Sequence, residues 1–423
     1  MRRDYLNNPI SAVAEATHAA IDDFVGGLLA YETRAERVLL AAEKDPDCCL
    51  VNIYAGFLWM LLEAPEGAQR ATRYLEAAEL AAGNANSRER LNLALLRAWI
   101  ADDLAAALQI ADRISDDFPH DLAVVKLHHY LEFNRGNSPE MLRVALKVMR
   151  ANDHVAHMHG MAAFAYEQCH RLDEAERCAR AALERLPKEP WAQHALAHVH
   201  LTRAEVDEGA STLAGFEASW TGLNSFMLTH LWWHLALFRL AQGRGARALD
   251  LYDQHVWGVV KSYSQDQIGA VSLLARLELA GVDVGERWQE LGAHLAARAA
   301  DTVQPFLTLQ YLYGLARAGR AEAEELLGAV RRRSGEAPAY CRAVWHEVAL
   351  PACEGLYAHA RGDYETAWRA LGTVLPRLEQ IGGSHAQRGL FDQILFDAAR
   401  KCGRPVEARK ALERHGSMLR GAS

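Results

Sequence analysis

Three short stretches between His154 and His255 carry the side chains best suited to chemistry in this sequence. They read His154-Val-Ala-His157-Met-His159, Trp191-Ala-Gln-His194-Ala-Leu-Ala-His198-Val-His200 and His230-Leu-Trp-Trp-His234. The span holds ten of the chain's nineteen histidines. Imidazole titrates near neutral pH and is the commonest metal ligand, so this density indicates acid–base, metal or ligand-binding chemistry.

Two pairs of these histidines have a spacing that places their side chains one turn apart on a helix. His194 and His198 form one pair, and His230 and His234 form the other. Each pair can bind a metal through both rings, although a single pair also arises by chance in an alanine-rich helix. Two pairs on successive helices favour a functional site. The alternative is a buried polar network that holds neighbouring helices in register.

The elements that must position these side chains are helices. Ala, Leu, Arg and Glu dominate the sequence, and apolar residues recur at helical spacing almost throughout. Strand and hairpin signals are nearly absent. The sequence therefore predicts an all-α fold.

The period of the helical pattern indicates which kind of all-α fold this is. Tyr166, Ala175, Ala182 and Pro187 resemble the tetratricopeptide repeat, a helix-turn-helix of about 34 residues, so one repeat covers 156–189. Further residues of the repeat pattern, most of them small, fall into register at Ala197, Gly209, Trp232, Leu235, Ala236, Gly243, Ala248, Gly362, Ala367, Gly403 and Ala408. Less regular helical pairs occupy Gln69–Ala82, Arg88–Ser115 and Leu122–Arg150.

We predict one continuous tetratricopeptide-like α-α solenoid over residues 1–423, with the candidate pocket in central repeats at 154–258. In the tetratricopeptide fold, which this region resembles, fixed places on the first helix of each repeat face the concave groove. That register implies a shared concave surface for His157, Glu167, Trp191, His194, His198, His230 and Trp233. It places His234 one position off, toward a neighbouring helix. The register gives no such support to His154, His159, His170, His200 and His255.

Within this surface we expect different roles for the polar and the aromatic side chains. Glu167 can fix an imidazole tautomer, act as a base or complete a metal's ligand set. The candidate catalytic residues are Glu167, His194, His198 and His230, and the candidate ligand-binding residues are His157, Trp191 and Trp233. If a metal is bound, its expected ligands are His194, His198 and His230.

A second candidate element is the stretch Ile381-Gly-Gly-Ser-His-Ala-Gln387-Arg388. Gly-Gly followed by Ser predicts a turn and an N-cap that open the next helix. Backbone N–H groups there, with Gln387 and Arg388, can form a polar wall or hold a carboxylate or phosphate in the central cavity. The alternative is an ordinary helix cap.

Composition excludes several classes of function. The net charge of −8 argues against a nucleic-acid binder, and no apolar run reaches the about 20 residues of a membrane span. The first residues lack the apolar segment of a secretory signal. The seven scattered cysteines are expected to be free thiols in a reducing compartment, so we predict a cytoplasmic protein.

Several longer motifs together resemble the tetratricopeptide repeat protein 38 family. They are Gly160-Met161 with Phe164 and Glu167, Trp191–Val199, Trp220, His230–Ala236, Leu251-Tyr252-Asp253, Gly281–Trp288 and Gly382–Arg388. The resemblance spans most of the chain and is strongest from Gly160 onward. It implies an all-helical cytosolic protein and leaves the biochemical activity open.

The chain departs from these relatives at polar positions. Many relatives carry Glu where this chain has Leu201, and they tend to carry Asp and His where it has Thr308 and Gln310. These departures remove possible metal donors, so the sequence favours an apo, hydrogen-bonding pocket over a divalent metal site. The expected partner is a small molecule or a peptide in the concave groove, with acid–base or metal-assisted chemistry left open. The rival prediction is a non-catalytic protein–protein scaffold.

Overall fold

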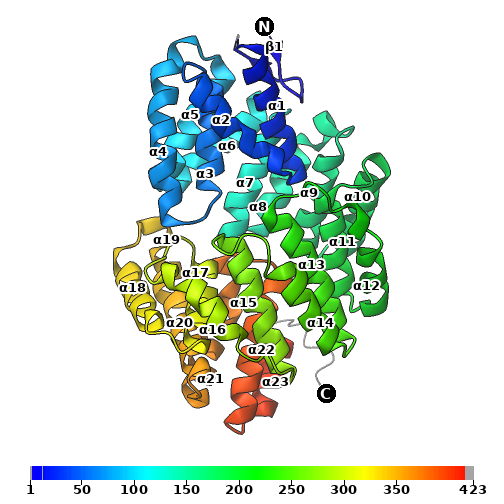
Figure 1. Cartoon of the computed structure of the whole chain (residues 1–423), viewed down its shortest axis with the longest axis vertical. Coiled ribbons are helices and arrows are strands. Elements are labelled where there is room, and N and C mark those ends of the chain that lie inside the picture. The colour runs from blue at the N-terminus through cyan, green and yellow to red at the C-terminus, as the bar shows by residue number, and fades with distance from the viewer. Residues whose placement is uncertain (1, 12, 415–423) are drawn as a thin grey trace. The chain divides into compact units, whose positions relative to one another are not determined.

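The computed structural model describes residues 2–11 and 13–414, and nearly all its regular structure is helical (Figure 1). The first helices are α1 Glu15–Ala30, α2 Arg37–Lys44, α3 Cys49–Met60, α4 Pro65–Leu80, α5 Ser87–Ile100, α6 Leu104–Asp117, α7 Leu122–Asn134, α8 Ser138–Met149, α9 Ala156–Gln168 and α10 Leu172–Arg185. They are followed by α11 Pro190–Thr202, α12 Val206–Ala214, α13 Ser225–Ala241, α14 Gly245–Leu251, α15 Ser264–Leu279 and α16 Arg287–Leu295. The last are α17 Pro305–Arg317, α18 Glu322–Glu336, α19 Ala339–Val344, α20 Leu350–Ala360, α21 Tyr364–Val374, α22 His385–Lys401 and α23 Pro405–Arg414.

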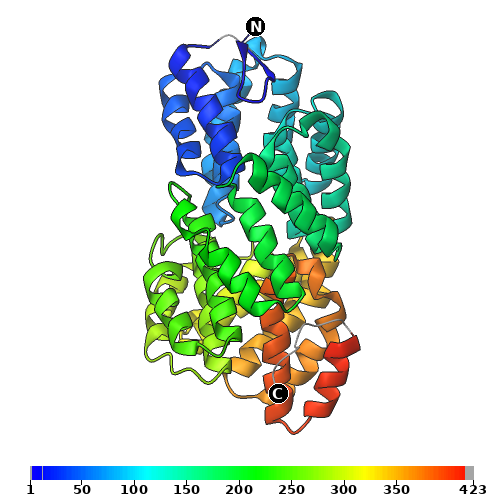
Figure 2. The ribbon, with the colours of Figure 1, turned by 90° about the vertical axis from the view of Figure 1, so that its right-hand side faces the viewer.

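Successive helices pack in pairs, as in a helical repeat protein, which confirms the predicted all-α class. The pair α9 and α10 covers the repeat expected at 156–189, and Ala175 and Ala182 are fully buried where α10 meets α9. Gly209 shows why small residues recur, because a Cβ there would lie 2.4 Å from the ring of Phe238. The pairing continues to the final helices, α22 and α23, drawn in red in Figure 2.

Contacts divide the chain into two compact units. The first consists of Met1–Phe133, Ser138–Leu196 and Phe216–Met227, and the second of Asn134–Asn137, Ala197–Gly215 and Leu228–Ser423. The boundary falls within α11 and within α13, so each of these helices contributes residues to both units. A single continuous solenoid over 1–423 stays a prediction, and residues 415–423 lie outside the described part of the chain.

The Gly-Gly-Ser stretch forms the turn and cap expected from its sequence. Gly382 and Gly383 have positive φ angles of 84° and 78°, and a Cβ on Gly383 would lie 2.5 Å from the Phe306 ring. Ser384 caps α22 through a capping box with Gln387. Both glycines are therefore required by the backbone conformation, which few other residues adopt.

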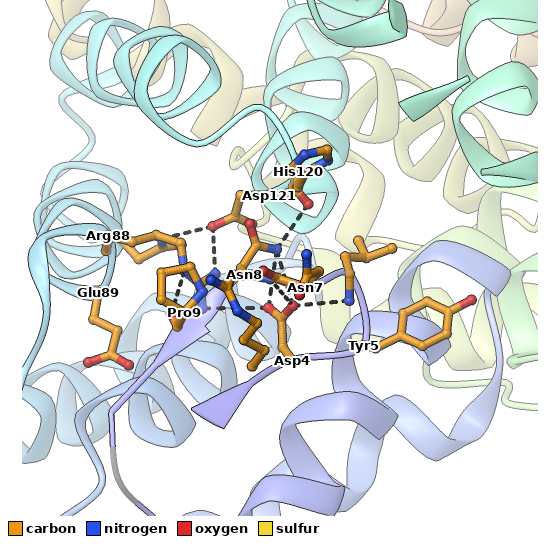
Figure 3. A network of polar contacts seen from close by, with 12 residues as sticks. Asp4, Tyr5, Asn7, Asn8, Pro9, Arg88, Glu89, His120 and Asp121 are labelled. Carbon is orange, nitrogen blue, oxygen red and sulfur yellow. Dashed lines mark hydrogen bonds and ion pairs between the residues drawn. The ribbon is translucent and has the colours of Figure 1, made fainter. Parts of the chain in front are cut away.

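A buried polar network fastens the N-terminal residues to the helices of the first unit (Figure 3). The guanidinium of Arg88 on α5 is fully buried and lies 2.8 Å from an oxygen of Asp121 and 3.5 Å from one of Asp4. Asn8 donates to the backbone carbonyl of His120 at 3.0 Å. Burial raises the pKa of Asp4, although the charge of Arg88 acts in the opposite direction.

Three smaller features complete the fold. The short strands β1 Arg2–Arg3 and β2 Pro9–Ile10 pair antiparallel, an element that the sequence did not predict. All seven cysteines are free thiols, as expected. Among the described helices, none combines the length and apolar character needed to cross a membrane.

Candidate metal centre and adjoining cavity

Three histidines of the second unit lie against one another. The ring centroid of His234 on α13 is 4.6 Å from that of His198 on α11 and 4.7 Å from that of His230. These side chains are 0%, 1% and 9% exposed, in that order. His194, itself buried, lies one turn before His198 on the same helix. One ring nitrogen from each of His198, His230 and His234 lies within 4.8 Å of the others.

His234 faces a neighbouring helix, as the repeat register implied, and there it meets His198 on α11. It therefore belongs to the histidine group, although the register did not include it among the groove-facing candidates. Residues four apart on an α-helix differ by only about 40° in direction, so His230 and His234 can face the same side.

Burial makes these imidazoles poor bases. Burial, with a smaller contribution from nearby His198, lowers the pKa of His230 to about 3. Burial also lowers the pKa of His234 well below its ordinary value, and His198, His230 and Arg276 act in the same direction. Both rings are therefore held neutral near pH 7, the form in which imidazole binds a metal.

Glu167 and His157 occupy other buried sites in the first unit. Glu167 on α9 is fully buried and accepts a hydrogen bond from Gln168. Among the described residues, Glu167 is not part of the histidine group. His157 on α9 pairs with the buried Glu189 at 3.1 Å. A metal or proton-transfer role for Glu167 and His157 stays a prediction.

The two candidate tryptophans pack in different surroundings. Trp191 stacks on His194 with ring centroids 4.3 Å apart and contacts Tyr31 and Phe164 in the first unit. Trp233 in the second unit lies parallel to His230, with centroids 5.2 Å apart and an interplanar angle of 9°. Both contacts hold histidine rings in place.

A small cavity adjoins His230 in the second unit. It has room for about one water molecule, so by itself it does not hold the extended ligand that was one of the two alternatives predicted from the sequence. It is lined by His230, Trp233, Gln265, Ile268, Gly269, Ser272, Gln310 and Gln387.

The two polar residues expected from the start of α22 behave differently. Gln387 lines the cavity beside His230. Arg388 turns back on its own loop, where it donates to the carbonyls of Gly382 and Gly383. A direct anion-binding role for Arg388 stays a prediction, and another arginine, Arg276, contacts two residues that line the cavity.

That arginine belongs to a stripe on α15 that the sequence analysis missed. Gln265, Gly269, Ser272 and Arg276 are spaced i, i+4, i+7 and i+11, so they share one face of the helix. Gln265, Gly269 and Ser272 line the cavity, and Arg276 donates to Ser272 Oγ. Small and polar residues at helical spacing in an otherwise apolar helix were the signal that could have found them.

The three positions at which the chain departs from the resembled family lie in different surroundings. Leu201 is half-buried near the end of α11. The Thr308 hydroxyl donates to backbone carbonyls of Asp301 and Gln304, both at 3.0 Å. Gln310 lines the cavity with His230. Gln310 is thus the one of the three departures that bears directly on this site.

A second group with metal-ligand atoms lies where α11 meets α12. His200 Nδ1 is 2.8 Å from Glu205 Oε2, and Glu208 completes the group. His200 is buried but Glu208 is exposed. The His200 group provides an internal comparison for any measurement of metal binding.

Comparisons with known proteins leave the family open. No protein-family model matches the chain, so the tetratricopeptide repeat protein 38 family stays a prediction. The chain is similar to one in the structure of Naa15/Naa10 bound to HypK-THB, with 12% identity and a TM-score of 0.27. The match covers 94% of this chain and 63% of that chain. A likeness at this TM-score is not evidence of shared function.

Proposed function

We propose that the histidine group of α11 and α13 binds a divalent transition metal ion, and that zinc fits it best. The observation that carries this proposal is the convergence of one ring nitrogen each from His198, His230 and His234 within 4.8 Å. In a tetrahedral zinc site with Zn–N distances near 2.0–2.1 Å, ligand nitrogens lie roughly 3.4 Å apart. Small ring movements would therefore be enough. This proposal reverses the preference for an apo site that was drawn from the sequence.

The chemistry of the donor set supports a first-row metal. Imidazole suits zinc, copper, iron and nickel, whereas magnesium and calcium prefer oxygen ligands. His198, His230 and His234 would supply three ligands from the second unit, and His194, one turn before His198 on α11, is the candidate for a fourth. Three protein ligands leave one position for water or substrate, while four close the site. A zinc ion with an open position would supply Lewis-acid chemistry to a bound ligand.

The competing function is a helical scaffold in which the histidines only stabilise helix packing. The parallel stacking of His230 on Trp233 favours this alternative, because such contacts need no metal. Ligand or peptide binding by the repeats and a cytoplasmic location remain predictions. The two functions differ in one measurable property, which is bound metal.

The first experiment measures metal in the full chain purified without an affinity tag. We expect one zinc per chain, lost in His198→Ala and in His230→Ala. Loss of a group that only orients a metal ligand typically weakens metal binding about 10–100-fold. Loss of a ligand itself should weaken zinc binding by more than this. Failure of the parent protein to bind zinc in direct titration, with a lower melting temperature in both variants, would establish the scaffold alternative.

Three further variants locate the ion. His255→Ala is the matched control, because His255 stacks on Trp232 outside the group, with centroids 3.9 Å apart. Glu205→Gln tests the His200 group. If this variant loses the zinc, the ion is bound at the His200 group and the proposal is refuted. His194→Ala separates a three-ligand from a four-ligand site through its effect on zinc affinity.

A further inference from the structure

Arg276 on α15 is a buried cation that forms no ion pair with any residue the structure describes. Arg276 is only 4% exposed, and its guanidinium donates to the Ala386 carbonyl at 2.6 Å and to Ser272 Oγ. Among the described residues, none has a carboxylate oxygen within 4.0 Å of the Arg276 guanidinium nitrogens, the limit for an ion pair. Asp392 acts on it only from farther away. Burying a charge is costly unless an opposite charge compensates it.

The face of α15 that carries Arg276 has open space beside Gly269. A Cβ added at Gly269 would meet nothing within 4 Å, although the residue is half-buried and lines the cavity. Glycine inside a helix is less stable than alanine, so this helix forgoes stability at that point. The open space adjoins the small cavity and gives a ligand more room than the cavity alone.

The residues that line this space include hydrogen-bond donors for which the described part of the chain provides no acceptor. The indole N–H of Trp233 is buried and has no hydrogen-bond acceptor among the described residues. Ser272 Oγ accepts from Arg276, which leaves its own proton free to donate. Gln387 Oε1 accepts from the Ser384 N–H, which leaves its NH2 group to donate. Unmade hydrogen bonds of buried groups cost free energy, and an acceptor ligand would recover it.

Gln310 completes the wall. Its Oε1 is buried with no donor in the described part of the chain. Because the two ends of an amide are nearly isosteric, a rotation of its side-chain amide presents NH2 in place of the oxygen. The lining of the cavity therefore includes several hydrogen-bond donors, and through Ser272 it adjoins a buried guanidinium that forms no ion pair among the described residues.

We propose that this cavity binds the carboxylate group of a small organic acid, with Arg276 as its buried counter-charge. Ser272 would link the guanidinium to the ligand, and Trp233 and Gln387 would donate to the carboxylate oxygens. The open space at Gly269 would give the carboxylate the room that the cavity alone lacks. The inference deepens the proposed function, because the carboxylate would lie beside a metal on His230.

Formate is the probe, because it is the smallest carboxylate and its C–H proton reports binding by saturation-transfer NMR. The measurement uses the full chain treated with a chelator, in buffers of equal ionic strength. We expect formate to bind and its neutral isostere formamide not to bind. Gly269→Leu should fill the space and weaken formate binding about tenfold or more. Equal signals from formamide, or unchanged formate binding in Gly269→Leu, would overturn the proposal.

Two further variants test the charge. Arg276→Met should abolish formate binding, but it also removes the bond to the Ala386 carbonyl and can affect folding. Ser272→Ala keeps that bond and should weaken formate binding several-fold, by about the value of one hydrogen bond. Undiminished formate binding in Ser272→Ala would exclude the link from Arg276 to the ligand.

Gly328→Leu is the matched control for the substitution at Gly269. Gly328 is a half-buried glycine within α18, remote in sequence from every cavity residue, and its Cβ would come near only the Arg332 side chain. Formate binding should be unchanged in Gly328→Leu. A chain that binds formate but no zinc would refute the metal proposal alone. A chain that binds zinc but no formate would refute the carboxylate site alone.

Discussion

Acidification from pH 7 to pH 5 is expected to lower the free energy of unfolding of the first unit by roughly 2–4 kcal/mol. The cause is a pair of adjacent histidines, His128 and His129, which are buried on α7. Burial, with the nearby charges of His128 and Lys126, lowers the pKa of His129 to about 3. Burial likewise lowers the pKa of His128 to about 4.

The direction follows from the protons bound in each state. Between the folded pKa and about 6.5, the unfolded chain binds a proton at each histidine and the folded chain does not, so stability rises with pH. Full stability is reached above about pH 6.5, and at pH 5 each fully shifted group costs about 2 kcal/mol. His128 should contribute less than His129, because Glu132 lies 3.9 Å from its ring and favours the protonated form.

Urea unfolding at pH 7 and pH 5 measures this loss directly. His129→Asn should reduce the difference between the two pH values by about 2 kcal/mol, and His128→Asn by less. His154→Asn is the control, since His154 is exposed, and it should change that difference by no more than about 0.5 kcal/mol. An equal loss on acidification in the parent and in a His128→Asn, His129→Asn double variant would exclude these histidines as the cause.

The fold was predictable because its signals are local. Ala175 and Ala182 are spaced for a helix that packs closely on its neighbour, and the Gly-Gly-Ser stretch can adopt few backbone conformations other than a turn and a cap. The i, i+4 spacing of His194 and His198 likewise fixes their relative direction on one helix. These features depend on a few consecutive turns of chain, so the sequence contains what is needed to predict them.

The site was predictable only in part, because it depends on which helices meet. No local pattern states that α15 and α22 pack together, so the cavity that Ser272 and Gln387 share could not be derived. His234 was left out of the candidate residues because the register placed it toward a neighbouring helix, and no local pattern states that His198 lies there. Arg276 was overlooked because a single arginine in a helix is normally solvated, and only its burial makes it unusual.

The buried network of the N-terminal residues leads to the second large expected effect. Replacing Asp121 with alanine should lower the free energy of unfolding by about 3–5 kcal/mol, because it leaves a buried guanidinium with one weaker partner. Arg88 lies 2.8 Å from Asp121 but 3.5 Å from Asp4, and all three side chains are at most 1% exposed (Figure 3). Asn92 also donates to Asp121 at 3.2 Å and would lose that bond.

A double-mutant cycle separates the ion pair from the packing around it. Arg88→Met with Asp121→Leu removes both charges and keeps much of the volume, so it should be less destabilising than Asp121→Ala alone. The control is Arg97→Met on the same helix, because the ion pair of Arg97 with Glu79 is about half exposed and should be worth less than about 1 kcal/mol. If urea unfolding finds Asp121→Ala no more destabilising than Arg97→Met, the network does not hold the N-terminal residues in place.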